Sequence, residues 1–592
     1  MKEITKYNLW TRDIYQKLCK LNKRLLFTII ILFQQLTIFY PVLNRKFEPH
    51  RWGDDFVIGS HWYLKNLQFQ FLPNSFAQWI ERVRSRAYLS EVIRSLIRAF
   101  HENYHALALF FVSLWIIGIV LFFISIAKFL RPEVSLICAL LLGAMPYRIE
   151  TLLYAQGDGY ILVFLMVILA ALLVIKANEK RLSLKFLLRV SSVLLFYLSL
   201  YLYEIATITA LSFTLLILYL HHNSKERKFS NYIYAFSFPV LAGVHSLIIV
   251  TSTNPTWNRS GLHNLTIQKN LEFLASFTHN YFWVMMAPLG WLVRDNSEII
   301  RFFKIILESK LFPFYFILFT TITFFSIFKI PTLVSIKEFA LKPLNQKRHK
   351  VGKNRIRSLK IIHNPLSIIF GIGIPSFLLL SPYIGFLTFS GGFPWRLTLL
   401  SNIGFVMIVG FWLNKISKDN SRNFLIFKSI TFIFILYFTL CSAFQIQSIS
   451  SVSKYDKMIE ERLFTKIGEM GQSVKLPILV NLPIPPCQAI GFWKWNPSIW
   501  EGNSGQLNLA EDLGLIYGRQ GEFAQVIYIP KNQPADTSKI SSGWQSDFSC
   551  NINSTRPSNY ASLASTVIFN KAYSGNTQFA FDRNLEIYEV KP

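Results

Sequence analysis

The chain has 592 residues, of which 52% are hydrophobic, and its mean hydropathy is +0.34. That apolar content, which includes 54 phenylalanines, exceeds what a soluble core needs and excludes an ordinary soluble protein. The formal net charge of +28 would suit a nucleic-acid-binding protein, but residues 450–592 hold 13 Lys and Arg against 13 Asp and Glu. The excess positive charge lies among the apolar runs, where it marks cytoplasmic loops and not a nucleic-acid partner.

Apolar runs that approach the ~20 residues needed to cross a bilayer predict a polytopic α-helical membrane protein. Residues 1–24 carry seven Lys and Arg against two acids, so the N-terminus is expected in the cytoplasm. The first run is longer than the core of a signal peptide and is expected to be a retained span. About eleven spans are predicted: 25–43, 106–130, 134–145, 161–175, two within 186–220 that meet at "YLYE", 232–250, 311–330, 366–387, 397–413 and 424–444.

Three long segments between the spans have their own character. Residues 44–105 form the first outer loop, in which "WIERVRSRAYLSEVIRSLIRAF" has the helical apolar spacing of an amphipathic helix on the bilayer surface. Residues 251–310 form a large outer loop whose apolar stretch 273–293 either dips into the interface or spans the bilayer. Residues 331–365 form a basic cytoplasmic loop, because 337–360 hold nine Lys and Arg and one Glu.

The chain is predicted to divide into a membrane domain, 1–449, and a C-terminal extracytoplasmic domain, 450–592. Short runs such as "KLPILVNLPI" and "NLEIYEV" alternate there with Gly, Pro, Asn and Ser, which predicts an α/β or mostly β module. Cys487 and Cys550 both fall in this segment. They form a disulfide or stay two unrelated thiols, and the sequence does not decide between the two.

Two adjacent acids, Asp54 and Asp55, follow the first predicted span in "HRWGDDFVIG". A carboxylate pair can share a proton or a divalent cation, and one member can act as a general base. The alternative is a solvated turn in which one Asp caps the backbone. Arg51 is one of several arginines around the pair, and a guanidinium can contact a lipid phosphate through two hydrogen bonds.

Other polar groups fall on the same predicted outer side of the membrane. Ionisable groups near hydrocarbon are costly, so their gathering on one face predicts a common polar cavity and not scattered loops. The alternatives without a functional role are a hydrophilic connector at "MPYRIETLLYAQGDGY" and a helix cap or ion pair for Glu204 in "YLYE". The candidate substrate-binding or phosphate-binding residues are Arg51, Arg148, Glu150, Gln156, Asp158, Glu204 and Arg396.

The acidic pair in the first outer loop, the amphipathic helix after it and the many spans together resemble the glycosyltransferase C superfamily of polytopic membrane glycosyltransferases. "RWGDDFVIG" looks like the first-loop acidic motif of that superfamily, which includes O-antigen glucosyltransferases and protein mannosyltransferases. "YLYEIATITALSFTL" is similar to a Tyr-rich span of the glucosyltransferase group. The resemblance covers the architecture of about residues 1–444, and it carries over residue by residue only at the acidic motif.

The resemblance implies an enzyme of the plasma membrane that moves a sugar from a polyprenyl-phosphate donor to a glycan, lipid or protein at the extracytoplasmic face. Asp54 or Asp55 would then be the catalytic base or its metal-binding neighbour, and Arg148 and Arg396 would contact the donor phosphate. The resemblance does not decide whether a divalent cation, Mg²⁺ or Mn²⁺, is needed; if one binds, Asp54 and Asp55 would be its ligands. The lipid bilayer, the donor and the acceptor are the expected partners, and no nucleic acid is expected.

Two other classes of function compete with this interpretation. A transporter or flippase of a lipid-linked or anionic substrate would place charged groups near the bilayer midplane and use broken helices. A non-catalytic assembly protein would use its C-terminal module to bind a partner, and Asp54, Asp55 and Glu204 would be dispensable in it.

Overall fold

The structure is a computed structural model, and it describes part of the chain. The described residues are 23–43, 74–85, 92, 96, 99–100, 103–145, 155–179, 182–222, 229–251, 266–278, 311–328, 365–381, 383, 398–419, 421–470, 479–481, 525–526, 578–581 and 587–589.

Among these residues, eight helices are long and apolar enough to cross a membrane. They are α2 (Lys23–Leu43), α7 (Tyr104–Ile126), α10 (Ala155–Glu179), α11 (Leu182–Leu202), α12 (Thr209–His222) with the short turn η1 (Glu204–Ala206) before it, α13 (Phe229–Val250), α21 (Leu399–Asp419) and α22 (Ser421–Met470). Three shorter apolar helices accompany them: α8 (Pro132–Ala144), α17 (Phe312–Phe328) and α19 (Pro365–Leu379). The chain is therefore a polytopic helical membrane protein, as its composition predicts.

Local sequence signals explain where the helices begin. Asn103 caps α7, because its side-chain oxygen accepts a hydrogen bond from the backbone N–H of Ala106 at 3.0 Å. The helix that follows contains no charged residue over Tyr104–Ile126, which suits burial in hydrocarbon. Pro132 occupies the first position of α8, where its missing N–H costs no intrahelical bond.

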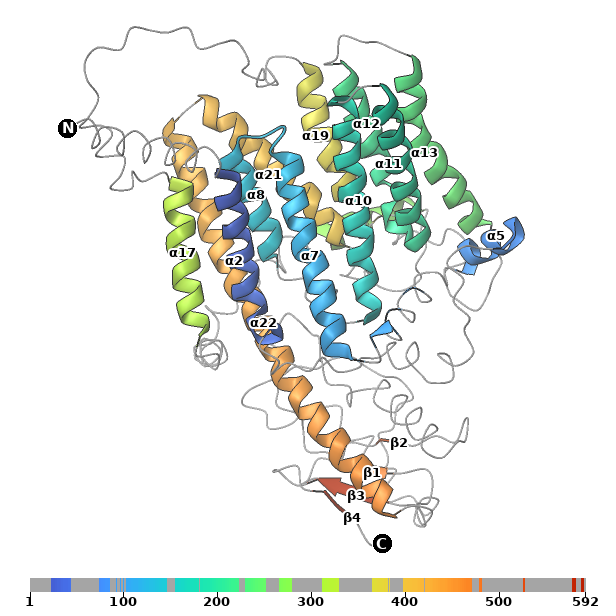
Figure 1. Cartoon of the computed structure of the whole chain (residues 1–592), viewed down its shortest axis with the longest axis vertical. Helices are drawn as coiled ribbons and strands as arrows, with labels where there is room; N and C mark the ends of the chain where they lie inside the picture. The colour runs from blue at the N-terminus through green and yellow to red at the C-terminus, as the bar shows by residue number, and fades with distance from the viewer. Residues whose placement is uncertain are drawn as a thin grey trace, which may run out of the picture.

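The helices lie side by side in two groups that share a seam (Figure 1). In the first group α2 contacts α7, α8, α17 and α22, and α21 packs on α8 and α22. In the second group α11 contacts α10 and α13, and α12 contacts α13 and α19. The seam is closed by α7 against α10 and by α19 against α21.

Short connections between helices that the sequence analysis predicts to be cytoplasmic lie at one end of the bundle. The ammonium of Lys128, after α7, lies 2.8 Å from the Glu179 carboxylate at the end of α10. The backbone N–H of Arg131 donates to Oδ1 of Asn414, near the end of α21, at 3.3 Å. These contacts join the helix ends, and we call this side the basic end of the bundle.

Two amphipathic helices lie at the opposite end, which we call the outer end. In α5 (Phe76–Ser85), Trp79 donates its indole N–H to the hydroxyl of Tyr197, near the end of α11. Val83 of the same helix is buried, whereas Phe76 is exposed. The amphipathic helix predicted over 79–100 is therefore present as α5 at its beginning, and its body lies mostly outside the described residues.

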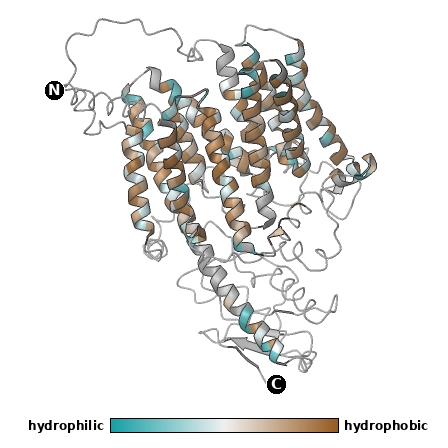
Figure 2. Ribbon diagram, viewed as in Figure 1, coloured by the Kyte–Doolittle hydropathy of each residue, from teal (hydrophilic) through white to brown (hydrophobic). Residues whose placement is uncertain are grey.

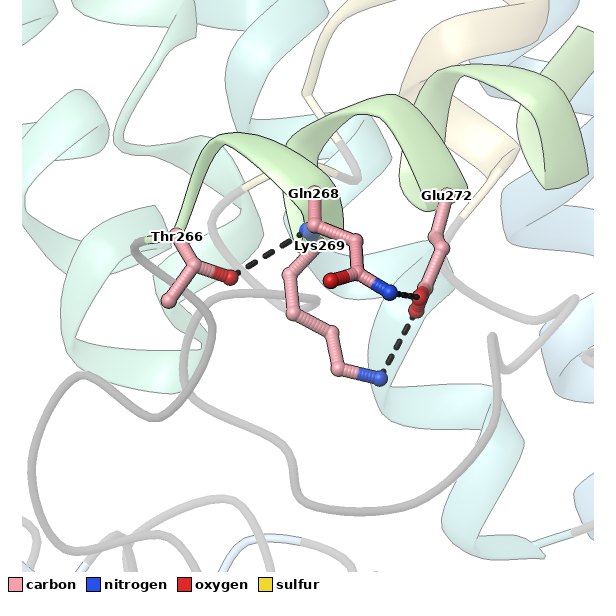
Figure 3. A network of polar contacts seen from close by, with 4 residues as sticks. All are labelled: Thr266, Gln268, Lys269 and Glu272. Carbon is pink, nitrogen blue, oxygen red and sulfur yellow. Dashed lines mark hydrogen bonds and ion pairs between the residues drawn. The ribbon is translucent and has the colours of Figure 1, made fainter.

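The second amphipathic helix, α14 (Ile267–Thr278), packs against Tyr383, four residues after the end of α19. The Phe273 ring packs edge-on against Tyr383, with centroids 5.2 Å apart. Figure 3 shows its first turns, where Thr266 accepts the N–H of Lys269 at 3.3 Å and Lys269 pairs with Glu272 at 2.7 Å. The hydrogen bond from Lys269 lowers the pKa of Glu272. With twelve residues α14 is too short to span, and most of the predicted stretch 273–293 lies outside the described residues.

The last helix extends well beyond the bundle. Fifty residues give α22 a length of about 75 Å, against a hydrocarbon core of about 30 Å. Figure 2 shows brown apolar residues along the bundle helices and teal polar residues near the lower end of α22. The helix runs through residue 450, at which the sequence analysis divides the chain.

Four short strands lie beside the far end of α22 (Figure 1). They form one mixed sheet in the order β2 (Gln525–Val526), β1 (Leu479–Asn481), β3 (Gln578–Phe581) and β4 (Ile587–Glu589). β1 is parallel to β2 and β3, and β4 is antiparallel to β3. Most of residues 450–592 outside α22 lie outside the described residues, so a separate C-terminal domain stays a prediction.

Each of the eleven predicted spans coincides with a described helix. The pair within 186–220 is α11 and α12, which meet at Glu204 as expected. The main difference is that α22 continues to Met470, twenty-six residues beyond the predicted end at 444, because polar residues there stay helical outside the apolar run. The number of helices that actually cross the bilayer stays a prediction.

We predict that Gly404→Val separates α19 from α21. A Cβ at Gly404 would lie 2.4 Å from both the backbone N of Leu379 and the backbone O of Pro375, and backbone atoms cannot move aside cheaply. We expect the free energy of unfolding to fall by about 1–3 kcal/mol, measured by denaturing the detergent-solubilised protein. Gly243→Val is the control, since a Cβ there meets no atom within 4 Å. Equal stability of the two variants would contradict this packing.

Candidate functional site

Helix α8 ends inside the bundle. Its thirteen residues reach about 20 Å, which is less than the hydrocarbon thickness of about 30 Å (Figure 1). Every residue from Val134 to Ala144 is buried, and Met145 after it is fully buried too. The last carbonyls of a helix have no partners within the helix, so this buried end needs other donors.

Side chains of α2 and α22 donate to Gly143 and Ala144, the last two carbonyls of α8, and to Leu140 one turn earlier. Gln34 donates to the Leu140 carbonyl at 2.9 Å, and Gln35 donates to the Gly143 carbonyl at 3.2 Å. The hydroxyl of Ser442 donates to the Ala144 carbonyl at 2.7 Å. The end of α8 is thus capped by side chains from two other helices, midway along α2.

The two glutamines are themselves held in place. Trp115 of α7 donates its indole N–H to Oε1 of Gln35 at 3.1 Å. Gln35 donates to Oε1 of Gln34 at 3.1 Å, and Gln34 also donates to the Thr439 hydroxyl at 3.1 Å. All four side chains are fully buried. We call Gln34, Gln35, Trp115, Thr439 and Ser442 the α8 cap.

Glycine at position 143 allows this close approach. A Cβ there would lie 2.6 Å from Nε2 of Gln35 and 2.7 Å from Oε1 of Gln34. Sequence reasoning did not single out the α8 cap. The signal was present as "QQ" in the middle of the first apolar run, where a polar pair must have internal partners.

The α8 cap bears on two candidate residues, Arg148 and Glu150. Both lie outside the described residues, in the segment 146–154. That segment starts at the buried Met145 and ends where α10 begins, at Ala155.

Glu204 is the candidate whose side chain the structure describes. It begins the turn η1 between α11 and α12, is only 4% exposed, and its backbone carbonyl accepts the N–H of Thr207 at 2.9 Å. The preceding residue, Tyr203, packs edge-on against Tyr160 of α10, with ring centroids 4.8 Å apart. A buried carboxylate at a helix junction is costly and needs compensation from its surroundings.

Gln156 and Asp158 lie in the first turns of α10, and their side chains are outside what the structure describes. The backbone of Asp158 is two residues from Tyr160, which contacts Tyr203. The start of α10 and the Glu204 turn therefore lie next to each other at the outer end. This places two predicted polar segments together, one from residue 155 onward and one at 203–206.

The remaining predicted site residues, Arg51, Asp54, Asp55 and Arg396, lie outside the described residues. The helix ends that flank them are described. α2 ends at Leu43 before the acidic pair, and α21 begins at Leu399 after Arg396. α2 runs toward the outer end of the bundle (Figure 1), and the positions of the four residues themselves stay a prediction.

Within the described part of the chain, no group of three or more His, Cys, Asp or Glu side chains could hold a metal ion. The predicted cation ligands Asp54 and Asp55 lie outside that part, so a metal at the acidic pair stays untested.

A second polar cluster lies near the basic end, and the sequence analysis missed it. The Arg189 guanidinium donates to Asn231 and lies 4.8 Å above the ring of Tyr234. Nδ2 of Asn231 is 2.8 Å from Nδ1 of His221, and Ser192 is 2.6 Å from the Tyr234 hydroxyl. These contacts join α11, α12 and α13 and give the Arg189 cation partners within the bundle.

An apolar cavity of about 170 Å³ lies in the seam between the two helix groups. It is bounded by α7, α10, α12, α19 and α21. Its lining includes Leu130 and Asn414 beside the basic end, and the described residues that line it include none of the predicted polar-site residues, so it is a separate feature.

No family model matches the chain, and no curated protein matches it. The resemblance to the glycosyltransferase C superfamily therefore rests on the sequence features alone.

We predict that Gln35→Leu destabilises the bundle. The substitution leaves the Gly143 carbonyl and the Trp115 indole without the partners they have at 3.2 and 3.1 Å. Buried polar groups without partners cost about 1–3 kcal/mol each, so we expect a loss of at least about 1 kcal/mol in unfolding free energy. Denaturation in mixed micelles measures it.

The matched control is Gln268→Leu on the surface of α14, where Gln268 bonds only the exposed Glu272, at 3.3 Å. We expect no loss of stability in this variant. If Gln35→Leu were as stable as Gln268→Leu, the α8 cap would contribute nothing and its hydrogen bonds would be an incorrect description of the interior.

Proposed function

We propose that the chain is a membrane glycosyltransferase that moves a sugar from a polyprenyl-phosphate donor to an acceptor at the extracytoplasmic face. The observation that carries the proposal is the buried Glu204 at the outer end, where the described helix ends flank the other predicted polar segments. A polytopic helical bundle with a polar centre at one end is the architecture that this reaction needs. The acidic motif "RWGDDFVIG" supplies the resemblance in residues.

Sugar transfer from a lipid-linked donor has to take place at the membrane surface. Its hydrocarbon tail stays in the bilayer, while its phosphate and sugar reach water at a helix end. A carboxylate that accepts the acceptor's proton and cations that face the phosphate are sufficient for transfer. The predicted segments carry both kinds of group.

In the proposed reaction, the acceptor hydroxyl oxygen forms a bond to the anomeric carbon of the sugar. The bond between that carbon and the phosphate oxygen breaks, and the polyprenyl phosphate leaves with the electron pair. Asp54 or Asp55 takes the hydroxyl proton. Arg148 and Arg396 stabilise the charge that develops on the phosphate, as guanidinium groups do.

Glu204 is assigned a binding role in this proposal. Glu204 lies at a helix junction beside Tyr203, which packs on Tyr160, and its carboxylate is proposed to accept hydrogen bonds from sugar hydroxyls. Arg51, Glu150, Gln156 and Asp158 complete the proposed set of binding residues. A divalent ion at Asp54 and Asp55 would add a charge on the phosphate, and the proposal does not depend on it.

One observation favours a second candidate, a transporter or flippase of a lipid-linked or anionic substrate. Helix α8 ends at mid-bundle, and broken helices at the midplane are a feature of transporters. The α8 cap weighs against it, because protein side chains already donate hydrogen bonds to the carbonyls at that helix end.

The test is transfer of a radiolabelled sugar from a polyprenyl-phosphate donor by membranes that contain the full chain. We predict that Asp54→Asn or Asp55→Asn lowers the rate by about 10²–10⁴-fold, the usual contribution of a general base. Glu204→Gln is expected to raise the KM for the sugar donor more than it lowers kcat, since its role is binding.

The matched control is Glu272→Gln, which removes an exposed carboxylate at the same outer end. We expect it to transfer sugar at the normal rate. Transfer by the Asp variants at the rate of this control would refute the enzyme. Movement of an intact lipid-linked substrate across reconstituted vesicles, without transfer, would establish the transporter instead.

A further inference from the structure

Four helices surround a small polar space near the basic end of the bundle. It lies near the ends of α10 and α12 and near the beginnings of α11 and α13. The space measures about 10 Å³, which is about what one water-sized atom needs. Each of the four helices contributes polar lining, and the polar lining residues are Asn178, Arg189, His221, Asn231 and Tyr234. We call this space the Arg189 pocket.

The guanidinium of Arg189 brings a positive charge to the pocket. It donates a hydrogen bond to Oδ1 of Asn231, and its central carbon lies 4.8 Å from the centre of the Tyr234 ring. Both partners are neutral, and within the part of the chain that the structure describes Arg189 forms no ion pair. Because a cation held away from water is costly without an opposite charge, an anion in the pocket would lower that cost.

The hydrogen bonds around the pocket determine which of its groups donate. A guanidinium can only donate, so Oδ1 of Asn231 faces Arg189 and Nδ2 of Asn231 donates to Nδ1 of His221 at 2.8 Å. Nδ1 of His221 is therefore an acceptor, and the hydrogen of the neutral ring is on Nε2. Ser192 donates to the Arg189 carbonyl at 2.7 Å, so the Tyr234 hydroxyl donates to Ser192 at 2.6 Å. The lining thus holds N–H donors and a positive charge, and none of its described residues is acidic.

Neighbouring charges do not cancel the charge of Arg189. Glu179 follows Asn178 on α10, but its carboxylate is paired with Lys128 at 2.8 Å. Two helices end beside the pocket and two begin there, so the opposite partial charges of these helix ends offset one another. The guanidinium therefore sets the sign of the electrostatic potential, and the pocket is positive.

The pocket reaches the surface of the bundle at the end of α10. Asn178 lies in the last turn of that helix and is exposed, and Arg189 is partly exposed, whereas His221 and Asn231 are 5% and 6% exposed. The 25 residues of α10 give it a length of about 37 Å, against a hydrocarbon core of about 30 Å. The end of α10 can therefore reach the layer of headgroups and water.

We infer that the Arg189 pocket is an anion site that takes one oxygen of a phosphate group. A phosphate oxygen is about the size of a water molecule and fits the space, and guanidinium groups bind phosphate oxygens by charge-assisted hydrogen bonds. The rest of the phosphate group stays outside, beside the exposed Asn178. A water molecule has the right size but leaves the charge of Arg189 unbalanced. The site lies at the opposite end from the proposed sugar chemistry and does not depend on it.

The phosphate group can belong to a lipid headgroup or to a soluble phosphate, and the experiment separates the two. It measures the melting temperature of the full chain, purified in a neutral detergent and a phosphate-free buffer. One arm adds sodium phosphate, with sodium chloride at equal ionic strength as its control. The other arm adds dioleoyl phosphatidic acid, with dioleoyl glycerol, which has the same chains and no phosphate, as its control. We expect a saturable rise in melting temperature with at least one phosphate compound and none with its control.

Two variants and a control locate the site. Asn178→Asp places a carboxylate at the edge of the pocket, where it competes with phosphate for Arg189, and we expect phosphate to bind at least about tenfold more weakly. Asn178 is exposed, so this variant is expected to fold. Asn423→Asp, the same change at an exposed position in the first turn of α22, is the control and is expected to bind like the unaltered chain. Arg189→Lys keeps the charge but loses the planar guanidinium, and we expect about fivefold weaker binding.

Each outcome decides for or against the site. A shift that Asn178→Asp removes supports the inference, and the compound that binds more tightly identifies the phosphate as soluble or as part of a lipid. If neither compound gives a saturable shift, the pocket holds water and the inference is overturned. Equal shifts in Asn178→Asp and Asn423→Asp would overturn it too, because the phosphate would then bind elsewhere.

Discussion

The structure depends on how the bundle satisfies the carbonyls at the buried end of α8. A helix end in hydrocarbon has no water to bond, so each open carbonyl there costs free energy. Gln34, Gln35 and Ser442 donate to the Leu140, Gly143 and Ala144 carbonyls, and Trp115 fixes the second glutamine. This arrangement lets α8 end at mid-bundle, which a bundle of uninterrupted spans does not do.

The two ends of the bundle consequently differ in chemistry. At the basic end, short connections and contacts such as Lys128 with Glu179 join the helices. At the outer end lie the buried Glu204, the amphipathic helices α5 and α14, and the ends of the helices that flank the acidic pair. The proposed sugar transfer uses the outer end.

Much of the helical architecture could be predicted from the sequence, because apolar runs and basic loops are local signals. The junction was predicted around "YLYE", where α11 ends and η1 begins, since a single acid interrupts an apolar run too long for one span. The glutamine pair of the α8 cap stands out in the first apolar run, but its partners could not be predicted, because Gln34 and Thr439 are 405 residues apart and only the fold brings them together. The apolar cavity in the seam was not predicted either, because it is formed between five helices and no single helix sequence indicates it. The acidic pair was found from its sequence alone, and it lies outside the described residues.

The most direct test of the account is the membrane side of each bundle end. Single cysteines would replace Leu43, Val250 or Ile267 at the outer end and Lys128, Asn178 or His222 at the basic end, in a chain whose five native cysteines are changed to serine. Labelling of intact cells with a membrane-impermeant maleimide is expected to reach the first three and to reach the last three only after permeabilisation. Labelling of both groups from the same side would contradict the two-ended bundle and the sugar chemistry assigned to it.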